Sequence, residues 1–147
     1  MRQLLWFTIL FIALACNDKD EEAENNLVGS WVAINFAVAN CEDIRDNDTG
    51  NIDCSDLNCQ RYIFSDSTTF IVQITTDGAT QSESGTLNVD GDRLTLCSED
   101  EEEVICEVFS FVLDENSLTL SEAADSTGCV RRVGYLREAT TDTLSSS

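Results

Sequence analysis

Histidine and proline are absent from this chain of 147 residues, and Lys19 is its only lysine. Without histidine the chain lacks the most common general base and the nitrogen ligand of mixed zinc sites, and no two of its cysteines have C-x-x-C spacing. It also lacks a nucleophile elbow and a glycine-rich phosphate loop. We therefore expect a protein without enzymatic activity, metal or cofactor.

Positive charge is scarce, because eight basic residues stand against 28 acidic ones and give a formal net charge of −20. Such a surface repels nucleic-acid phosphates, so we expect no nucleic-acid partner. It can attract cations or a basic protein. An acidic surface that keeps an exported protein soluble explains the same composition more simply.

A long apolar run occurs only near the N-terminus, where residues 4–14 follow Arg2. The run is too short to span a bilayer stably and is typical of a signal peptide. It ends at Ala13-Leu14-Ala15-Cys16, which resembles a lipobox, the motif in which lipid is attached to the cysteine before the signal is cleaved. We predict a lipoprotein signal peptide over residues 1–15 and a lipidated Cys16 that anchors the chain to a membrane of the cell envelope.

The cysteine count supports this assignment, since seven cysteines would leave one unpaired thiol in an exported protein. If Cys16 carries lipid, six cysteines remain, enough for three disulfides in an oxidising compartment. These six are Cys41, Cys54, Cys59, Cys97, Cys106 and Cys129.

Residues 16–26 are almost wholly polar or charged and predict an acidic linker. Lys19, followed by two acidic residues shortly after Cys16, resembles the surface-export signal of Bacteroidetes lipoproteins. We expect an outer-membrane lipoprotein, and both the periplasmic face and the cell surface remain open. Residues 139–147 predict a flexible polar tail.

The rest of the chain predicts one all-β domain, because short runs of Val, Ile, Thr and Phe are separated by Gly and Asp turns. Asp90-Gly91 between two alternating runs predicts a two-residue hairpin in which both positions have positive φ. No segment has a convincing helical stripe. The expected strands cover residues 28–38, 61–64, 69–75, 81–89, 93–97, 104–113, 117–120 and 129–137.

The connections between these eight strands fall into two groups. If successive strands alternate in direction, three tight links lie at one end, around residues 65–68, 90–91 and 114–116. The long link over residues 40–58 and the six cysteines fall at the other end or at adjoining strand ends. This separation favours a small eight-stranded up-and-down antiparallel barrel, closed at one end and stapled by disulfides at the other.

Four segments resemble the small lipocalin-like domains of Bacteroidetes lipoproteins: Leu27-Val28-Gly29-Ser30-Trp31, the step from Phe64 to Phe70, Gly85-Thr86-Leu87 before the hairpin, and Tyr135-Leu136-Arg137. The resemblance covers residues 27–138 and implies that Trp31 plugs the closed end beneath Arg137. The chain has shorter strands than full lipocalins and no C-terminal helix, so the resemblance does not imply a large cavity.

Two acidic segments are candidates for binding. The run from Asp46 to Asp53 places oxygen ligands at alternate positions, as calcium sites do, but its EF-hand frame has Leu57 at the twelfth position. We expect it to be a solvated acidic loop. The run over residues 98–103 also predicts an exposed loop, because consecutive carboxylates without a base cannot be buried.

One cysteine pair follows from strand register. A hairpin centred between Glu101 and Glu102 places Cys97 opposite Cys106. The other four cysteines can pair in three ways. We favour one bridge inside the 40–58 link and one from that link to the start of the last strand.

These features favour a monomeric, non-catalytic binding module that captures a small hydrophobic ligand or a partner surface at the open end of the barrel. If Phe70, Val72, Ile74, Phe109 and Phe111 pack the interior solid, the small-ligand hypothesis is wrong. The alternative is a protein–protein role, as inhibitor of a basic enzyme or as accessory subunit of a surface complex. A surface module without a discrete ligand is a third hypothesis.

Overall fold

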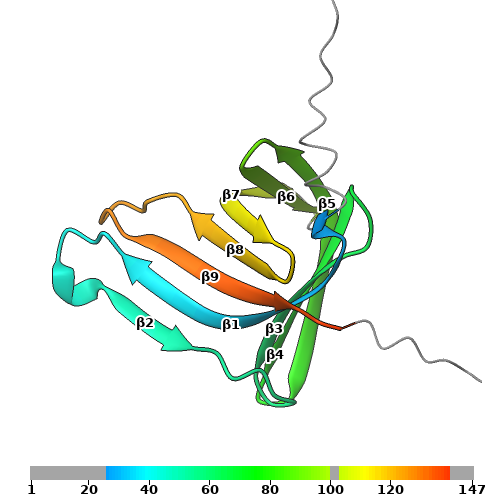
Figure 1. Cartoon of the computed structure of the whole chain (residues 1–147), viewed down its shortest axis with the longest axis horizontal. Helices are drawn as coiled ribbons and strands as arrows, with labels where there is room; N and C mark the ends of the chain where they lie inside the picture. The colour runs from blue at the N-terminus through cyan, green and yellow to red at the C-terminus, as the bar shows by residue number, and fades with distance from the viewer. Residues whose placement is uncertain (1–25, 100–102, 140–147) are drawn as a thin grey trace, which may run out of the picture.

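In the computed structural model, residues 26–99 and 103–139 are described, and they form nine strands with one short 3-10 helix (Figure 1). The elements are β1 Gly29–Ala39, η1 Ile44–Asp46, β2 Asp48–Asn51, β3 Cys59–Phe64, β4 Thr69–Thr76, β5 Ala79–Asp90, β6 Arg93–Glu99, β7 Val104–Asp114, β8 Ser117–Glu122 and β9 Val130–Arg137.

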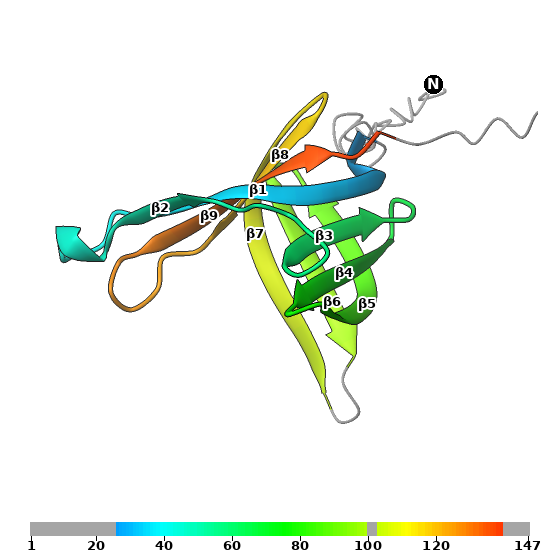
Figure 2. The same cartoon turned by 90° about the horizontal axis from the view of Figure 1, so that it is seen from below.

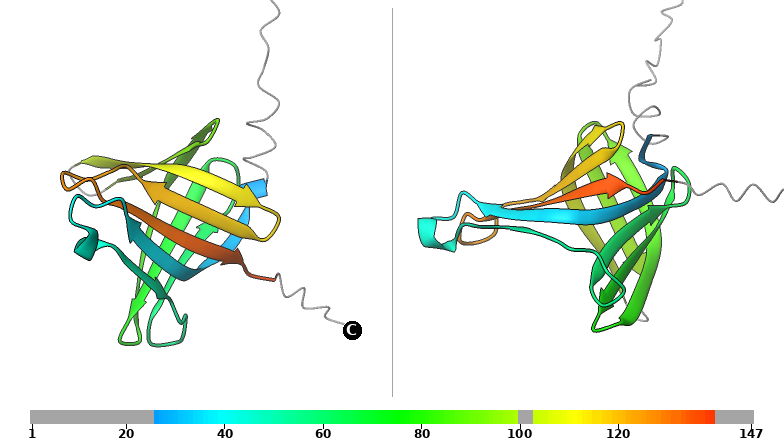
Figure 3. Two further views of the ribbon diagram at one scale, coloured as in Figure 1. Left: turned by 60° about the vertical axis from the view of Figure 1, so that its left-hand side comes forward. Right: turned by 60° about the horizontal axis from the view of Figure 1, so that its bottom comes forward.

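Eight of these strands close into an antiparallel barrel, which confirms the predicted fold class. β3 to β9 pair in chain order, and β1 pairs with β3 on one side and with β9 on the other (Figure 3). The register of β6 with β7 includes Cys97 opposite Cys106, as the hairpin argument predicts. Inward-facing side chains from all eight strands form one core.

The closed end of the barrel, where β1 begins and β9 ends, contains the most deeply buried side chains. Trp31 is fully buried there, and its indole Nε1 donates to the carbonyl of Leu27 at 2.7 Å. The guanidinium of Arg137 lies 4.3 Å from the centre of the Trp31 ring, the arrangement that the lipocalin resemblance implies. Leu27, Phe64, Leu94 and Leu118 complete this group of side chains, each no more than 1% exposed.

Arg137 also forms hydrogen bonds with the first residues of the domain. Its Nη1 donates to the carbonyl of Val28 at 2.6 Å, and its Nη2 donates to the carbonyl of Asn26. Contact with the barrel thus begins at Asn26, one residue before the start of the domain at residue 27 that the resemblance implies. A guanidinium held over an aromatic face still has donors in its plane, and here they reach the two entering carbonyls.

β1 bends out of the barrel at a bulge between Ala33 and Asn35. A bulge adds an unpaired residue and bends its strand. Here the carbonyl of the extra residue, Ile34, accepts from Ile52 at 2.8 Å. Beyond the bulge, β1 pairs with β2 and with the first half of β9, and these strands project from the barrel as an arm (Figure 2).

The arm corrects the prediction that residues 40–58 are a link without a strand, because that segment contains η1 and β2. β2 was missed because its sequence, DTGN, has no apolar alternation. It packs on β1 through Gly50, where a Cβ atom would lie only 2.5 Å from the Phe36 ring. A glycine that makes room for an aromatic ring leaves no hydrophobic signal of its own.

Two turns differ from expectation. β5 and β6 are joined by Gly91 and Asp92, of which only Gly91 has positive φ, the pattern of a type II′ turn. The pair with two positive φ values is instead Asp77 and Gly78, at 52° and 79°, between β4 and β5. This fourth tight turn lies at the end of the barrel where longer links were expected. Link length alone therefore does not distinguish the two ends of the barrel.

Several predictions lie outside the described residues: the signal peptide over residues 1–15, Cys16, most of the linker over 16–26, residues 100–102 of the second acidic run, and most of the tail over 139–147. Within residues 26–99 and 103–139, no helix is long and apolar enough to cross a membrane.

Candidate functional site

The barrel opens where two hairpins separate. β5 pairs with β6 only from Gly85 to Asp90, while the first residues of β5 pair with β4 alone. Gly85 marks the point of divergence, because a Cβ atom there would lie 2.0 Å from the carbonyl oxygen of Cys97. Only glycine permits this close backbone approach, after which the hairpins β4–β5 and β6–β7 form separate walls.

Between these walls lies a hollow made of two adjacent spaces of about 390 Å³ and about 240 Å³. Both spaces are lined by Val72, Glu83, Ser98 and Ile105. The interior is therefore not packed solid at the open end, although Phe70, Phe109 and Phe111 are buried. The remaining lining residues are Tyr62, Phe70, Ile74, Gln81, Ser82, Leu96 and Glu107.

An aromatic group forms the floor of the hollow. Tyr62 stacks on Phe64 with ring centres 5.8 Å apart and meets the edge of Tyr135 at 5.6 Å. The Phe70 ring lies 6.4 Å from that of Tyr62. Rings fixed against one another in this way give a rigid apolar surface for a ligand to pack on.

The Tyr62 hydroxyl is the polar group on this floor. Tyr62 is only 7% exposed, yet its hydroxyl has no hydrogen-bond partner within the described part of the chain. No side-chain nitrogen or oxygen there is both fully enclosed and unpaired, so this hydroxyl is reached from the hollow. Burial, followed by the charges of Glu107, Glu83 and Glu122, raises the pKa of Tyr62 to about 12.

Carboxylates stand on the inner face above the floor. Glu83 pairs with Val72 across β4–β5, and Glu107 pairs with Leu96 across β6–β7; both line the hollow. Glu122 pairs with buried Phe109, and paired residues share a face of the sheet. Four adjacent strands of the wall thus carry three inward-facing acids.

One guanidinium on the arm acts on the same tyrosines. Arg131 lies on the same face of β9 as buried Val133 and Tyr135, because it precedes them by two and four residues. It pairs with Val38 of β1. Its charge lowers the pKa of both tyrosines, against the larger effect of burial, which raises the pKa of Tyr135 further than that of Tyr62. In the described part of the chain, the inner face around the hollow is therefore acidic, and Arg131 on the arm opposes this charge.

The three disulfides lie outside this hollow. Cys97–Cys106 links β6 to β7 on the outer side, because Cys97 alternates with inward-facing Leu96 and Ser98. Cys41–Cys129 links the segment that follows β1 to the segment that precedes β9, at the far end of the arm. All three bridges lie at the end of the barrel opposite the plug, as expected, and they fix its outer wall and the arm.

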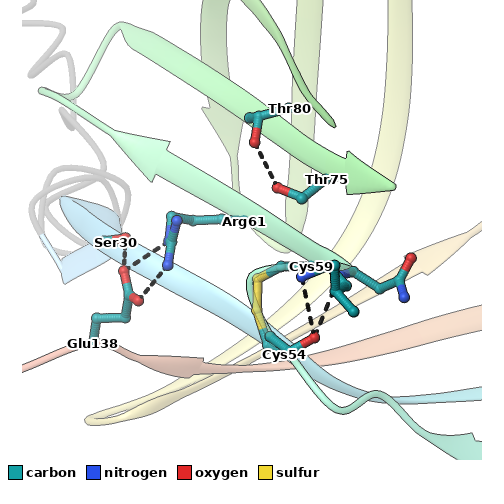
Figure 4. The surroundings of a disulfide bond; sticks show 10 residues. Ser30, Cys54, Cys59, Arg61, Thr75, Thr80 and Glu138 are labelled. Carbon is teal, nitrogen blue, oxygen red and sulfur yellow. Dashed lines mark hydrogen bonds and ion pairs between the residues drawn. A yellow bond between two sulfur atoms is a disulfide. The ribbon is translucent and has the colours of Figure 1, made fainter. Parts of the chain in front are cut away.

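Cys54–Cys59 closes the short link before β3, also on the outer wall (Figure 4). Near it the Arg61 guanidinium pairs with the Glu138 carboxylate at 2.8 Å, and Ser30 donates to the same carboxylate. These contacts, together with the Thr75–Thr80 hydroxyl pair at 2.9 Å, join β1, β3, β4, β5 and the end of β9 on the outside.

The acidic run from Asp46 to Asp53 does not gather around one point. Asp48 begins β2, and Asp43 instead caps η1 and pairs with Arg45 at 2.5 Å. Hydrogen bonds from Arg45 lower the pKa of Asp43. Among residues 26–99 and 103–139, no three Asp, Glu, Cys or His side chains are placed to hold one metal ion.

Sequence reasoning sought the site in the loops and missed the residues of the inner wall. A signal was present in strand parity. Glu107 continues the inward series of Phe109 and Phe111, and Glu122 continues that of Leu118 and Leu120. In each strand, every second residue points into the barrel. Where such a series of apolar residues ends in a charged residue at the open end, it indicates a polar mouth above a packed core.

No family model matches the chain, and no curated protein matches it significantly. Among solved structures, a lipocalin-like protein from Bacteroides uniformis is similar with a TM-score of 0.53 and 15% identity. The match covers 78% of this chain and all of the other. Lobster apocrustacyanin A1 is also similar, with a TM-score of 0.48 and 16% identity over 83% of this chain and 66% of its own length. The chain has a lipocalin-like fold.

Proposed function

We propose that this protein is a binding protein that takes one small, partly apolar molecule into the hollow between the hairpins β4–β5 and β6–β7. The observation that carries the proposal is the hollow itself, with its floor of Tyr62 and Phe70. Its size is within the range of small-molecule sites. Loops and strand ends on a rigid scaffold are also where binding residues usually lie.

The test compares two tryptophan substitutions in β4, one that fills the hollow and one that does not. Val72→Trp places a large side chain in the hollow, while the control Ile71→Trp places it on the outer face of β4. With the neutral fluorescent probe N-phenyl-1-naphthylamine, we expect Val72→Trp to weaken binding by about tenfold or more, roughly 1.4 kcal/mol, and the control to bind normally. Equal binding by both variants, or no binding by the parent chain, would overturn the proposal.

We further propose that lipid on Cys16 holds the closed end toward a membrane and leaves the hollow facing away. Both ends of the described chain, Asn26 and Ala139, lie at the closed end, which supports this orientation. Cys16→Ser is expected to abolish labelling by a fatty-acid analogue and release the domain from membranes. Persistent labelling of this variant would exclude Cys16 as the anchor.

A further inference from the structure

Three carboxylates on the inner face of the barrel, two of which line the hollow, have no partner in the described residues. Glu83, Glu107 and Glu122 come from β5, β7 and β8, and within the described chain none of them forms a hydrogen bond or an ion pair. Exposed surface acids are usually just solvated, so their number alone indicates nothing. These three differ because they point inward, above an apolar floor.

The second, independent observation is the Tyr62 hydroxyl. It belongs to a side chain more than nine-tenths buried, lies on the floor of the same hollow, and lacks a partner in residues 26–99 and 103–139. Because this hydroxyl is reached from the hollow, a molecule bound there can form a hydrogen bond with it. The hollow thus offers an apolar floor, one hydrogen-bonding group and an acidic wall in a single space.

We propose that the ligand is a small organic cation whose apolar or aromatic part packs on Tyr62 and Phe70 while its positive group lies among Glu83, Glu107 and Glu122. This inference rests on the function proposed above and specifies its ligand class. Aromatic faces and carboxylates both attract cations, so the floor and the wall favour the same charge.

A bare metal ion does not fit this arrangement, because within the described residues no three such side chains converge to coordinate one. An anion is disfavoured by the three acids, and among the described residues that line the hollow there is no basic side chain, while Arg131 acts from the arm. The net charge of −20 acts in the same direction over longer distances.

The experiment uses three probes that share one ring system and differ in charge: 2-naphthylmethylamine, 2-naphthylmethanol and 2-naphthylacetate. Titration calorimetry with the full chain in zwitterionic nanodiscs, corrected with empty nanodiscs, measures each affinity at low salt. We expect the ammonium to bind at least about fivefold more tightly than the alcohol, the factor for one close pair of unit charges in water. The carboxylate is expected to bind most weakly.

Variants locate the charge preference. Glu83→Gln and Glu107→Gln are each expected to weaken amine binding by about fivefold and leave the alcohol unchanged, which also shows that the hollow is intact. Glu115→Gln, in the turn between β7 and β8 at the closed end, changes the net charge equally and is expected to change neither affinity. Arg131→Gln is expected to strengthen amine binding.

The outcomes separate the two proposals. If the alcohol binds as tightly as the amine, or if Glu115→Gln weakens the amine as much as Glu107→Gln does, the inference about charge is wrong while the binding function stands. If no probe binds to the parent chain, the proposed function fails and the inference fails with it.

Discussion

The closed and open ends of the barrel are built from the same eight strands but differ in what their inward side chains do. At the closed end, Trp31, Phe64, Leu94 and Leu118 are completely buried, and Arg137 covers the plug with hydrogen bonds to the entering chain. At the open end, the inward-facing positions of these strands are instead occupied by exposed glutamates, which lie above an unfilled space. Stability is concentrated at one end, and the other is left free for binding.

Replacement of the plug is expected to have the largest effect on stability. Trp31→Ala removes a fully buried indole and should lower the free energy of unfolding by about 3–5 kcal/mol. Leu136→Ala, on the outer face of the neighbouring strand and 45% exposed, should cost under about 1 kcal/mol. Urea denaturation compares the two, and similar costs would mean that the closed end is not the stable centre of the fold.

Alkaline pH should act through the aromatic floor of the open end. The folded pKa values of Tyr62 and Tyr135 are raised above the usual value of 10.0, so the unfolded chain loses these protons first. The contribution of Tyr62 to stability, on the order of 3 kcal/mol, is present below pH 10 and lost as the pH rises through about 12. Phenolate absorbance measures this directly, and titration of both tyrosines near pH 10 would contradict their burial.

The boundary between the two regions can be tested at Gly85. Gly85→Ala places a methyl group against the carbonyl of Cys97, so β5 and β6 must move apart. We expect a loss of about 1–3 kcal/mol and a changed affinity for N-phenyl-1-naphthylamine. Ser84→Ala, at the exposed neighbouring position, is the control, and equal behaviour of the two variants would show that the close approach is unimportant.

The smallest effect is expected on the outer wall. Arg61 and, less strongly, Ser30 lower the pKa of Glu138 below its usual value of 4.5, so the pair stabilises the fold at neutral pH. This contribution is lost as the pH falls through the lowered folded pKa. Because the pair is partly exposed, Glu138→Gln should cost less than about 1 kcal/mol at pH 7. The difference from the parent chain should vanish in acid, and a constant difference would point to another cause.

The barrel was predictable because period-two alternation and Gly or Asp turns repeat along the chain, and one strand register followed from the positions of Cys97 and Cys106. The arm was not, since β2 packs through Gly50 and the bulge at Ile34 carries no local signal. The acidic wall was missed for a different reason. Strand parity places Glu107 and Glu122 on the inner face, but exposed glutamates are common in this chain, and only the fold shows that Glu83 and Glu107 line one hollow.

The most direct test of the central claim is to locate 2-naphthylmethylamine on the protein. Methyl groups of Val72 and Ile105 line the hollow, whereas those of Val108 and Val112 are exposed on the outer face of β7. Nuclear Overhauser effects from the naphthyl protons report which set lies within contact. We expect cross-peaks to Val72 and Ile105, and cross-peaks only to Val108 and Val112 would contradict binding in the hollow.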